Sequence, residues 1–241
     1  GDWSSDVCSS DLDVISDISS DGKETVYIAT DGNGVHFLSH KKQQVTRRFY
    51  HDVSDKEGIR SNSVYSLLVD DRGAVWVGHF QAGLDYSLYQ NGLFRTYAYP
   101  PLFNSANLSI RSFISRGQEK VIGSRDGLFY INEATGMVKS FVKPVLTSDL
   151  ILTISFYQGE YYIGTYGGGM MVLNPETLSL KYFSQSDTEL FQKGHIFCVK
   201  PDTKGNLWIG TSQGLFNYNG QTKQIKHFTS ANSQLPEGNV Y

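Results

Sequence analysis

The sequence lacks the features that define several common classes of protein. Only two of its 241 residues are cysteines, which is too few for a disulfide framework. No apolar stretch approaches the ~18 residues that a membrane-spanning helix needs. The N-terminus has neither basic residues nor a continuous apolar core, so it does not resemble a signal peptide. We therefore expect any export signal to lie outside this chain.

The sequence also has no large excess of positive or of negative charge. The formal net charge is −3, and the longest basic runs are the pairs Lys41-Lys42 and Arg47-Arg48. Such a surface has no general attraction for nucleic acid or for an anionic membrane. We therefore expect no nucleic-acid partner.

Aromatic residues and glycine are abundant. Fifteen Tyr, 14 Phe and three Trp accompany 24 Gly, whereas Met is scarce. Aromatic residues suit a pleated, half-buried surface, and frequent glycine punctuates such a surface with turns. The composition therefore favours β-structure.

A short motif recurs five times along the chain. It is an apolar strand that ends in a small residue followed by a hydroxyl or other polar residue, and its copies are 27–30 (YIAT), 76–79 (WVGH), 121–124 (VIGS), 162–165 (YIGT) and 208–211 (WIGT). Successive copies begin 41 to 49 positions apart, a period typical of propeller blades. Another strand precedes each copy. A glycine turn and two further strands follow it, the last ending in an aromatic residue.

Four strands per period, joined by short turns, make an antiparallel meander. One meander cannot bury both of its faces, whereas meanders stacked radially as blades can. A sandwich or a barrel would not need the same four-strand unit at this spacing. We therefore predict an all-β fold, a β-propeller with five near-complete repeats and the start of a sixth over residues 13–241, with the anchor residues Trp76 and Trp208 packed between blades.

Two of the repeats resemble a known family. The segment from Asn62 through Asp70 and Gly73 to Trp76, and the segment from Asp202 through Trp208 to residue 215, are similar to the two-component regulator propeller repeat. The resemblance implies the periplasmic sensor domain of a membrane histidine kinase, of the hybrid type by which Bacteroides-type bacteria detect polysaccharide fragments. The third repeat departs from the pattern, because Val121 stands in place of the aromatic residue.

The resemblance also implies a larger assembly. Sensors of this family resemble closed seven-bladed rings, and residues 235–241 match the start of a new repeat, so we expect the chain to be a fragment of such a ring. Its partners would then be the missing blades and the downstream receptor domains, with a membrane reached only through the full-length protein; a homodimer is left open. Residues 1–12 lie outside the repeat and resemble a translated sequencing adapter. We interpret them as a non-native tail, the alternative being a disordered native linker.

No sequence pattern indicates a cofactor, a metal or a catalytic site. His36 and His40 are not joined by Cys or by a second His cluster, so we expect no zinc site. The glycines of 32–34 and 167–169 are interpreted as turns, because neither segment continues as a phosphate-binding fingerprint. Ser124 lacks the helix that a nucleophile elbow requires. Enzymatic propellers bring together residues from several blades, and a sequence does not show such convergence.

Topology predicts where a ligand would bind. In a propeller, the loops that enter the first strand of each blade share one face with the loops between the second and third strands. The candidate ligand-binding residues on this face are Arg60, Asn62, His79, Phe80, Gln81, Arg111, Arg125, Asp126, Tyr166, His195 and Gln213. They combine planar hydrogen-bonding groups with aromatic rings, as sugar recognition requires. The alternative is that they are ordinary loop residues or contacts to another domain.

Three functional hypotheses follow. The first, which rests on the resemblance, is a ligand-sensing extracytoplasmic module of a two-component receptor that detects oligosaccharides. The second is a protein-interaction scaffold that uses the same face, marked by a large apolar patch. The third is a polysaccharide lyase or hydrolase, marked by a converging carboxylate pair or His/Tyr/Arg group. We favour the first hypothesis, under which this chain itself is not an enzyme.

Overall fold

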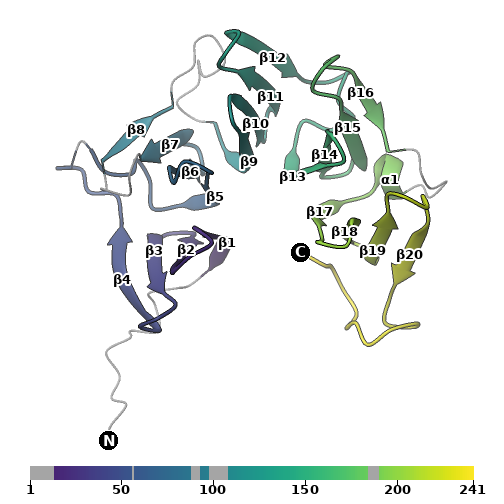
Figure 1. Ribbon diagram of the computed structural model, residues 1–241, viewed down its shortest axis with the longest axis horizontal. Helices are drawn as coiled ribbons and strands as arrows, with labels where there is room; N and C mark the ends of the chain where they lie inside the picture. The colour runs from purple at the N-terminus through teal and green to yellow at the C-terminus, as the bar shows by residue number, and fades with distance from the viewer. Residues whose placement is uncertain (1–13, 56, 88–92, 98–107, 184–189) are drawn as a thin grey trace, which may run out of the picture. The chain divides into compact units, whose positions relative to one another are not determined.

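The protein is described by a computed structural model that covers residues 14–241 except 56, 88–92, 98–107 and 184–189. The described residues form five four-stranded antiparallel sheets (Figure 1), which confirms the predicted all-β propeller fold. In each sheet the strands are hydrogen-bonded in chain order, as in a meander. Residues 1–12, which are interpreted above as a non-native tail, lie outside the described residues.

Contacts divide the chain into two compact units, residues 1–111 and 112–241. The first unit contains two sheets. The first sheet consists of β1 (Ile15–Ser20), β2 (Thr25–Thr30), β3 (Gly34–Ser39) and β4 (Gln44–Phe49). The second sheet consists of β5 (Val64–Val69), β6 (Val75–His79), β7 (Leu84–Ser87) and β8 (Phe94–Thr96). The boundary between the units falls inside β9 (Ile110–Arg116), the first strand of the third sheet.

The remaining strands lie in the second unit. They are β10 (Glu119–Ser124), β11 (Gly127–Asn132) and β12 (Met137–Phe141); β13 (Ile151–Tyr157), β14 (Glu160–Thr165), β15 (Met170–Leu173) and β16 (Leu180–Tyr182); and β17 (Ile196–Pro201), β18 (Asn206–Thr211), β19 (Gly214–Asn219) and β20 (Ile225–Phe228). The one helix among the described residues is α1 (Leu190–Lys193), and none of those residues forms a helix long and apolar enough to cross a membrane.

Each copy of the sequence motif ends the second strand of a sheet, which explains its small third residue. A Cβ atom on Gly164 would lie 2.6 Å from Thr153 Cγ2 and 2.7 Å from Ile196 Cγ2 of the next sheet. Gly78 and Gly123 have the same relation to Ile110 and Ile151. The glycine therefore makes room for the first strand of the following blade.

The first sheet solves the same packing problem with different side chains. Its motif carries Ala29 instead of glycine, and the first strand of the next sheet carries Val64 instead of isoleucine. Both residues are fully buried and belong to one hydrophobic cluster. An added methyl group on one blade is thus matched by a smaller side chain on its neighbour, as close packing requires.

The hydrophobic core lies between consecutive sheets within each unit. In the first unit, one cluster joins both sheets, and the rings of Phe49 and Phe94 meet edge to face at 4.8 Å. In the second unit, two clusters join the third to the fourth sheet and the fourth to the fifth. Aromatic edge-to-face contacts of this kind stabilise beyond the area that they bury.

The motif tryptophans contact their own sheets. The Trp76 ring stacks on Tyr86 at 5.0 Å and meets Tyr97 edge-on at 5.2 Å. Its Nε1 donates a hydrogen bond to Asp70 Oδ2 at 3.0 Å, and Trp208 Nε1 makes the same bond to Asp202. These hydrogen bonds join each tryptophan to the turn of its own hairpin, and the packing of the two rings between blades stays a prediction.

The Asp70 carboxylate organises the β5–β6 turn. Its Oδ1 accepts from the backbone N–H groups of Arg72 and Ala74 at 3.0 and 2.9 Å. Burial by itself would raise the pKa of Asp70, but the hydrogen bonds from Trp76, Ala74 and Arg72 outweigh it and lower the pKa below its ordinary value. The ionised carboxylate is therefore part of the folded structure.

We expect Asp70→Asn to lower the free energy of unfolding at pH 7 by roughly 1.5–3 kcal/mol, because it removes charge-assisted hydrogen bonds. The folded pKa lies below the unfolded value of about 3.9, so the stabilisation is present above that pH and is lost as the pH falls through the folded pKa. Urea denaturation at pH 7 and pH 3 should therefore show a smaller difference between wild type and variant at pH 3. An equal difference at both pH values would contradict this account.

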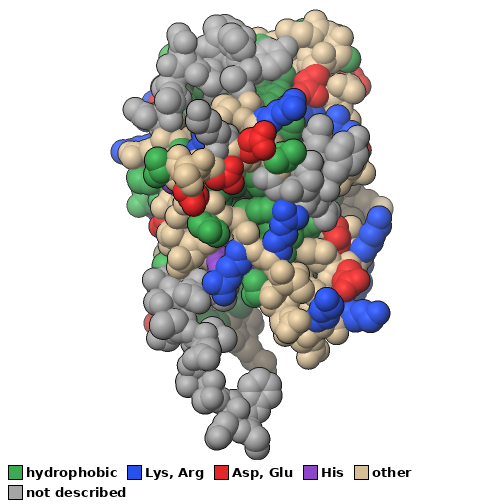
Figure 2. Space-filling model, turned by 90° about the vertical axis from the view of Figure 1, so that its left-hand side faces the viewer, with side chains coloured by type: hydrophobic (Ala, Val, Ile, Leu, Met, Phe, Trp, Pro, Cys, Tyr) green, Lys and Arg blue, Asp and Glu red, His purple; other side chains and the backbone are tan. Residues whose placement is uncertain are grey.

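The surface charges agree with the absence of a basic run in the sequence. On the face shown in Figure 2, the Lys and Arg side chains of the described residues are interspersed with Asp and Glu. Mixed charges of this kind are typical of a solvated surface.

Candidate functional site

Comparison of the repeats with one another singles out the second sheet. In the other four sheets, the last residue of the second strand is Ser or Thr, and its hydroxyl donates to the carbonyl oxygen of the glycine before or at the start of the third strand, at 2.8–3.1 Å. The second sheet has His79 at this position. The third strand of the second sheet carries Asp85, which pairs with the second residue of the motif, Val77. The residues that pair with the second motif residue in the other four sheets are His36, Phe129, Met171 and Phe216. Two ionisable residues thus replace a simple hydroxyl bridge.

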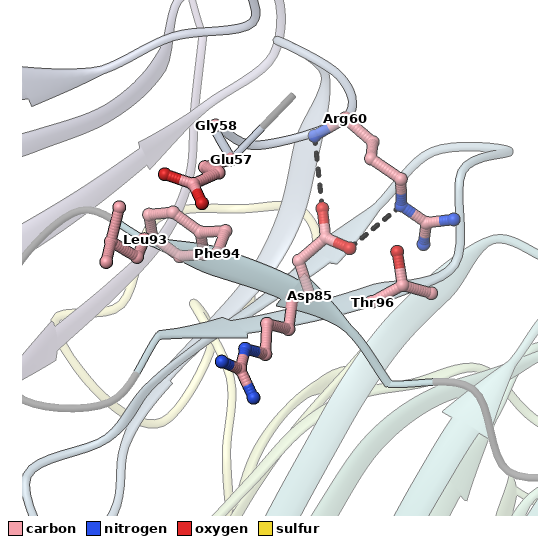
Figure 3. A pocket seen from close by; sticks show the side chains of 8 residues that line it. Glu57, Gly58, Arg60, Asp85, Leu93, Phe94 and Thr96 are labelled. Atoms are coloured by element: carbon pink, nitrogen blue, oxygen red, sulfur yellow. Dashed lines mark hydrogen bonds and ion pairs between the residues drawn. The ribbon is translucent and has the colours of Figure 1, made fainter. Parts of the chain in front are cut away.

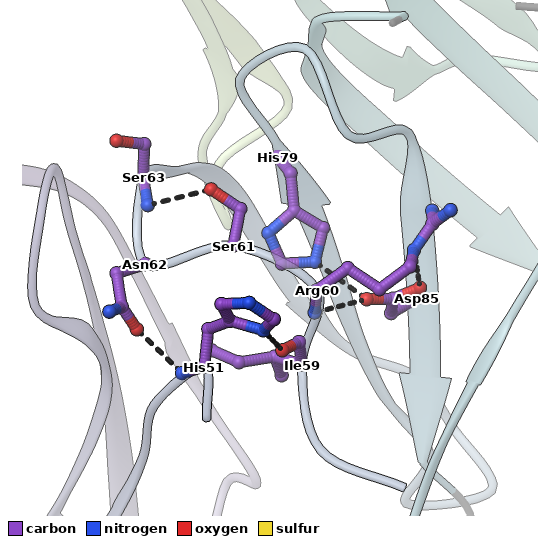
Figure 4. Close-up of polar contacts among 8 residues, drawn as sticks. All are labelled: His51, Ile59, Arg60, Ser61, Asn62, Ser63, His79 and Asp85. Atoms are coloured by element: carbon purple, nitrogen blue, oxygen red, sulfur yellow. Dashed lines mark hydrogen bonds and ion pairs between the residues drawn. The ribbon is translucent and has the colours of Figure 1, made fainter. Parts of the chain in front are cut away.

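His79 and Asp85 form a buried polar cluster with Arg60 (Figure 4). His79 Nε2 lies 2.9 Å from Asp85 Oδ2, and Arg60 Nε donates to Asp85 Oδ1 at 2.8 Å. The backbone N–H of Arg60 also donates to Asp85 Oδ2, at 3.0 Å. The side chains of His79 and Asp85 are 0% and 1% exposed, whereas that of Arg60 is 34% exposed. Arg60 is therefore the member of the cluster that reaches solvent.

The electrostatics of the cluster favour an ionised carboxylate. Burial would raise the pKa of Asp85, but the hydrogen bond from His79 and the charge of Arg60 lower it below its ordinary value. His79 Nδ1 is buried and has no hydrogen-bond partner. An ionised carboxylate only accepts, so His79 Nε2 carries the proton of this hydrogen bond and donates it to Asp85.

The loop that carries Arg60 is held firmly at both of its ends. The backbone N–H of His51 donates to Asn62 Oδ1, and His51 Nδ1 donates to the Ile59 carbonyl oxygen at 2.9 Å (Figure 4). The Asn62 carbonyl oxygen accepts from Gly32 and Gly34 of the first sheet, at 3.1 and 2.9 Å. Asn62 therefore acts here through the conformation of the loop.

Arg60 and Asp85 line a pocket with a volume of about 390 Å³ (Figure 3). The other lining residues are Glu57, Gly58, Leu93, Phe94, Arg95 and Thr96, all of the first unit. The lining combines two carboxylates, two guanidinium groups and a hydroxyl with two apolar side chains, and its formal charges balance. A pocket of this composition suits a small ligand rich in hydroxyl groups.

The remaining candidates of the first unit lie at the same end of the second sheet. Phe80 and Arg111 are brought together by Tyr65, whose ring lies 5.2 Å from that of Phe80 and 4.9 Å from the Arg111 guanidinium carbon. Gln81 is exposed and adopts φ 53°, and its backbone N–H donates to Ser109 Oγ at 3.2 Å. Its structural role is therefore in the turn.

In the second unit, the structure brings together two of the five candidates. The half-exposed Tyr166 ring lies over His195, with centroids 4.0 Å apart and planes 32° from parallel. Arg125, Asp126 and Gln213 are exposed turn residues. The candidates thus form a pair in this unit, and the three turn residues stay predictions with no shared contact to support them.

Sequence reasoning missed Asp85 and Tyr65. Asp85 lies inside strand β7, whereas the topology of a propeller points only to residues in its loops. The missed signal was a comparison of the repeats in register, since Asp85 is an acid at a position where three of the other sheets have Phe or Met. Tyr65 follows the first residue of β5 and was assigned only to the strand.

The arrangement is suited to binding. The His79 ring is fully buried and its Nε2 is engaged by Asp85, so it presents no nitrogen to a bound molecule. Arg60 and Thr96 line the pocket and offer donors and acceptors there. Within the described part of the chain, no three His, Cys, Asp or Glu side chains are placed to hold a metal ion.

Solved structures share the fold. The extracellular domain of BT3049 from B. thetaiotaomicron, described as a hybrid two component system, is 24% identical with a TM-score of 0.67, and the match covers 89% of this chain and 30% of that one. BT4673 from the same organism, described as a one component system, is 21% identical with a TM-score of 0.63, covering 88% and 27%. PorZ, a surface component of the type-IX secretion system of Porphyromonas gingivalis, is 16% identical with a TM-score of 0.69, covering 93% and 35%.

The TM-scores show that the three structures share the fold of this chain. The chain spans about a third or less of the length of each of them. None of the curated proteins compared with the chain matches it in sequence. The family model described as "Two component regulator propeller" matches residues 58–81 and 191–213. The first match contains Arg60 and His79, and the second contains His195. The matched segments contain the first two strands of the second and fifth sheets, and these segments are similar to the two-component regulator propeller repeat.

Proposed function

We propose that the chain is a ligand-binding module of an extracytoplasmic sensor in a two-component system, and that its ligand is an oligosaccharide. The observation that carries the proposal is the replacement of the hydroxyl bridge of four sheets by the buried His79–Asp85–Arg60 cluster beside a pocket. A buried charged group is costly unless it is paired. A repeat that departs from its neighbours in this costly way is a candidate for function.

The chemistry of the pocket supports a saccharide. Arg60, Arg95 and Thr96 supply donors, Glu57 and the Thr96 hydroxyl supply acceptors, and Leu93 and Phe94 supply an apolar wall. Hydroxyl groups need donors and acceptors together, and the C–H face of a sugar ring needs an apolar surface. The regulator repeats and the extracellular neighbours with the same fold support the sensor role and the extracytoplasmic location.

The test is a titration of the full chain with a panel of neutral oligosaccharides, monitored by calorimetry and by ¹H–¹⁵N NMR. We expect a saturable response whose largest shifts fall on residues 57–60, 85 and 93–96. Arg48→Gln, at an exposed position of β4, serves as the matched control for loss of an arginine and should bind like wild type. No response to any saccharide, or shifts confined to residues away from this pocket, would refute the proposal.

A further inference from the structure

Arg111 is a partly buried cation without an anionic partner. It is the second residue of β9, and its guanidinium carbon lies 4.9 Å above the Tyr65 ring. Its Nε is buried and has no hydrogen-bond partner, and no ion pair joins its side chain to a described carboxylate. An arginine has five N–H donors, and burying one of them unpaired costs free energy.

The position of Arg111 in the repeat sets it apart further. The second residue of this first strand is Ser16, Tyr65, Leu152 and Phe197 in the other four sheets, so Arg111 is the one charged member of the set. A stacking role alone would be served by the aromatic rings found at two of these positions. The charge and its planar donors are what this sheet adds.

Two aromatic rings, those of Tyr65 and Phe80, lie beside Arg111. Tyr65 packs against Phe80 at 5.2 Å with the rings 42° from parallel, so the two rings form a supported wall beneath the guanidinium group. Tyr65, Phe80 and Arg111 are all partly exposed and all belong to the first unit. An arginine over an aromatic ring keeps N–H donors for a planar or tetrahedral anion, which it binds through paired hydrogen bonds.

We propose that Arg111, held on Tyr65, binds an anionic substituent of the ligand, either a carboxylate or a sulfate, so that the module selects acidic saccharides over neutral ones. The inference rests on the proposed function, because it assigns a charge to the ligand class proposed there. The Arg60 guanidinium is already paired with the Asp85 carboxylate. Arg111 has no such counter-charge.

The test compares ligands that differ only in charge. The wild-type chain is titrated with an oligogalacturonate and with the same oligosaccharide as its methyl ester; a sulfated disaccharide and its desulfated form make the second pair. We expect the acidic member of at least one pair to bind roughly 10- to 100-fold more tightly, because a charge-assisted bidentate contact is gained. The pair that shows the preference identifies the substituent. Added salt should weaken only the acidic member.

Variants and a direct readout locate the effect. Arg111→Gln should reduce binding of the acidic saccharide to the level of its neutral counterpart and leave the neutral one unchanged. Arg111→Lys should retain part of the preference, and Arg48→Gln should retain all of it. In the wild-type chain, the Arg111 Nε–H resonance should shift when the acidic saccharide or inorganic sulfate is added.

The outcomes separate this inference from the proposed function. Equal affinity for both members of each pair would overturn the role of Arg111 and leave saccharide sensing intact. A charge preference that survives in Arg111→Gln, or an Arg111 Nε–H resonance that no anion shifts, would also overturn it. If no saccharide binds but inorganic sulfate shifts the resonance, the anion site stands and the saccharide proposal fails.

Discussion

Gly164→Val is expected to lower the free energy of unfolding of the second unit by about 3 kcal/mol or more, the upper end of the cost of overpacking a core. A side chain at this position must occupy space already filled by Thr153 and Ile196, both of which are β-branched and therefore stiff. The fourth and fifth sheets would have to move apart before valine could fit beside Ile196. Urea denaturation of the full chain, followed by circular dichroism, measures the effect.

The matched control introduces the same side chain where there is room. Ser140 is exposed on β12, so Ser140→Val should change the free energy of unfolding by no more than about 0.5 kcal/mol. Gly78→Val should reproduce the large effect in the first unit, since Ile110 covers that glycine. Equal stability of Gly164→Val and Ser140→Val would show that the blades do not pack through the motif glycine.

The fold was predictable because its information is local and repeated. The strand ends at residues 30, 79, 124, 165 and 211 agree with the five motif copies, and even the third repeat, where Val121 replaces an aromatic residue, keeps the register. The small third residue of the motif, glycine in four blades and Ala29 in the first, reflects a packing constraint that recurs along the chain. A pattern imposed five times by the same constraint is visible in one sequence.

Details of packing were less predictable. The sequence shows that Trp76 is apolar and lies in a strand, but it does not show that Asp70 captures the indole N–H within the same hairpin. Likewise, Ala29 and Val64 compensate for each other over 35 positions, and only the contact between their sheets makes that visible. The number of blades in the complete assembly stays a prediction.

The candidate site was predicted only in part. Loop topology indicated Arg60, His79 and Arg111, and the structure places all three at one end of the second sheet. It did not indicate Asp85, because a strand residue was expected to serve the core. The acid that joins Arg60 to His79 is thus the residue that topology alone leaves out.

Changing Asp85 alone should cost much more stability than changing it together with His79. Asp85→Ala leaves the Arg60 guanidinium and the fully buried His79 without their partner, and it is expected to cost about 3–5 kcal/mol of unfolding free energy. The double variant His79→Thr, Asp85→Met reproduces the residues of the fourth sheet, Thr165 and Met171. Its stability should recover most of the loss seen in Asp85→Ala, because the buried imidazole is gone and Met fills the space of Asp85, while the 34% exposed Arg60 guanidinium can reach water.

The acid dependence of the two chains should differ as well. The folded pKa of Asp85 lies below its unfolded value of about 3.9, so wild type gains stability from this group above that pH and loses it as the pH falls through the folded pKa. The double variant lacks the group and should lose less stability between pH 7 and pH 3. Urea denaturation at both pH values measures the difference, with Asp70 present in both chains.

Binding separates a structural role from a functional one. Both variants should lose oligosaccharide binding, since each removes the carboxylate that orients Arg60 in the pocket. A double variant that is stable and still binds the oligosaccharide with wild-type affinity would show that the cluster only fixes the loop before β5. A double variant that is stable and does not bind would show that the second sheet departs from the repeat in order to recognise its ligand, at no gain in stability.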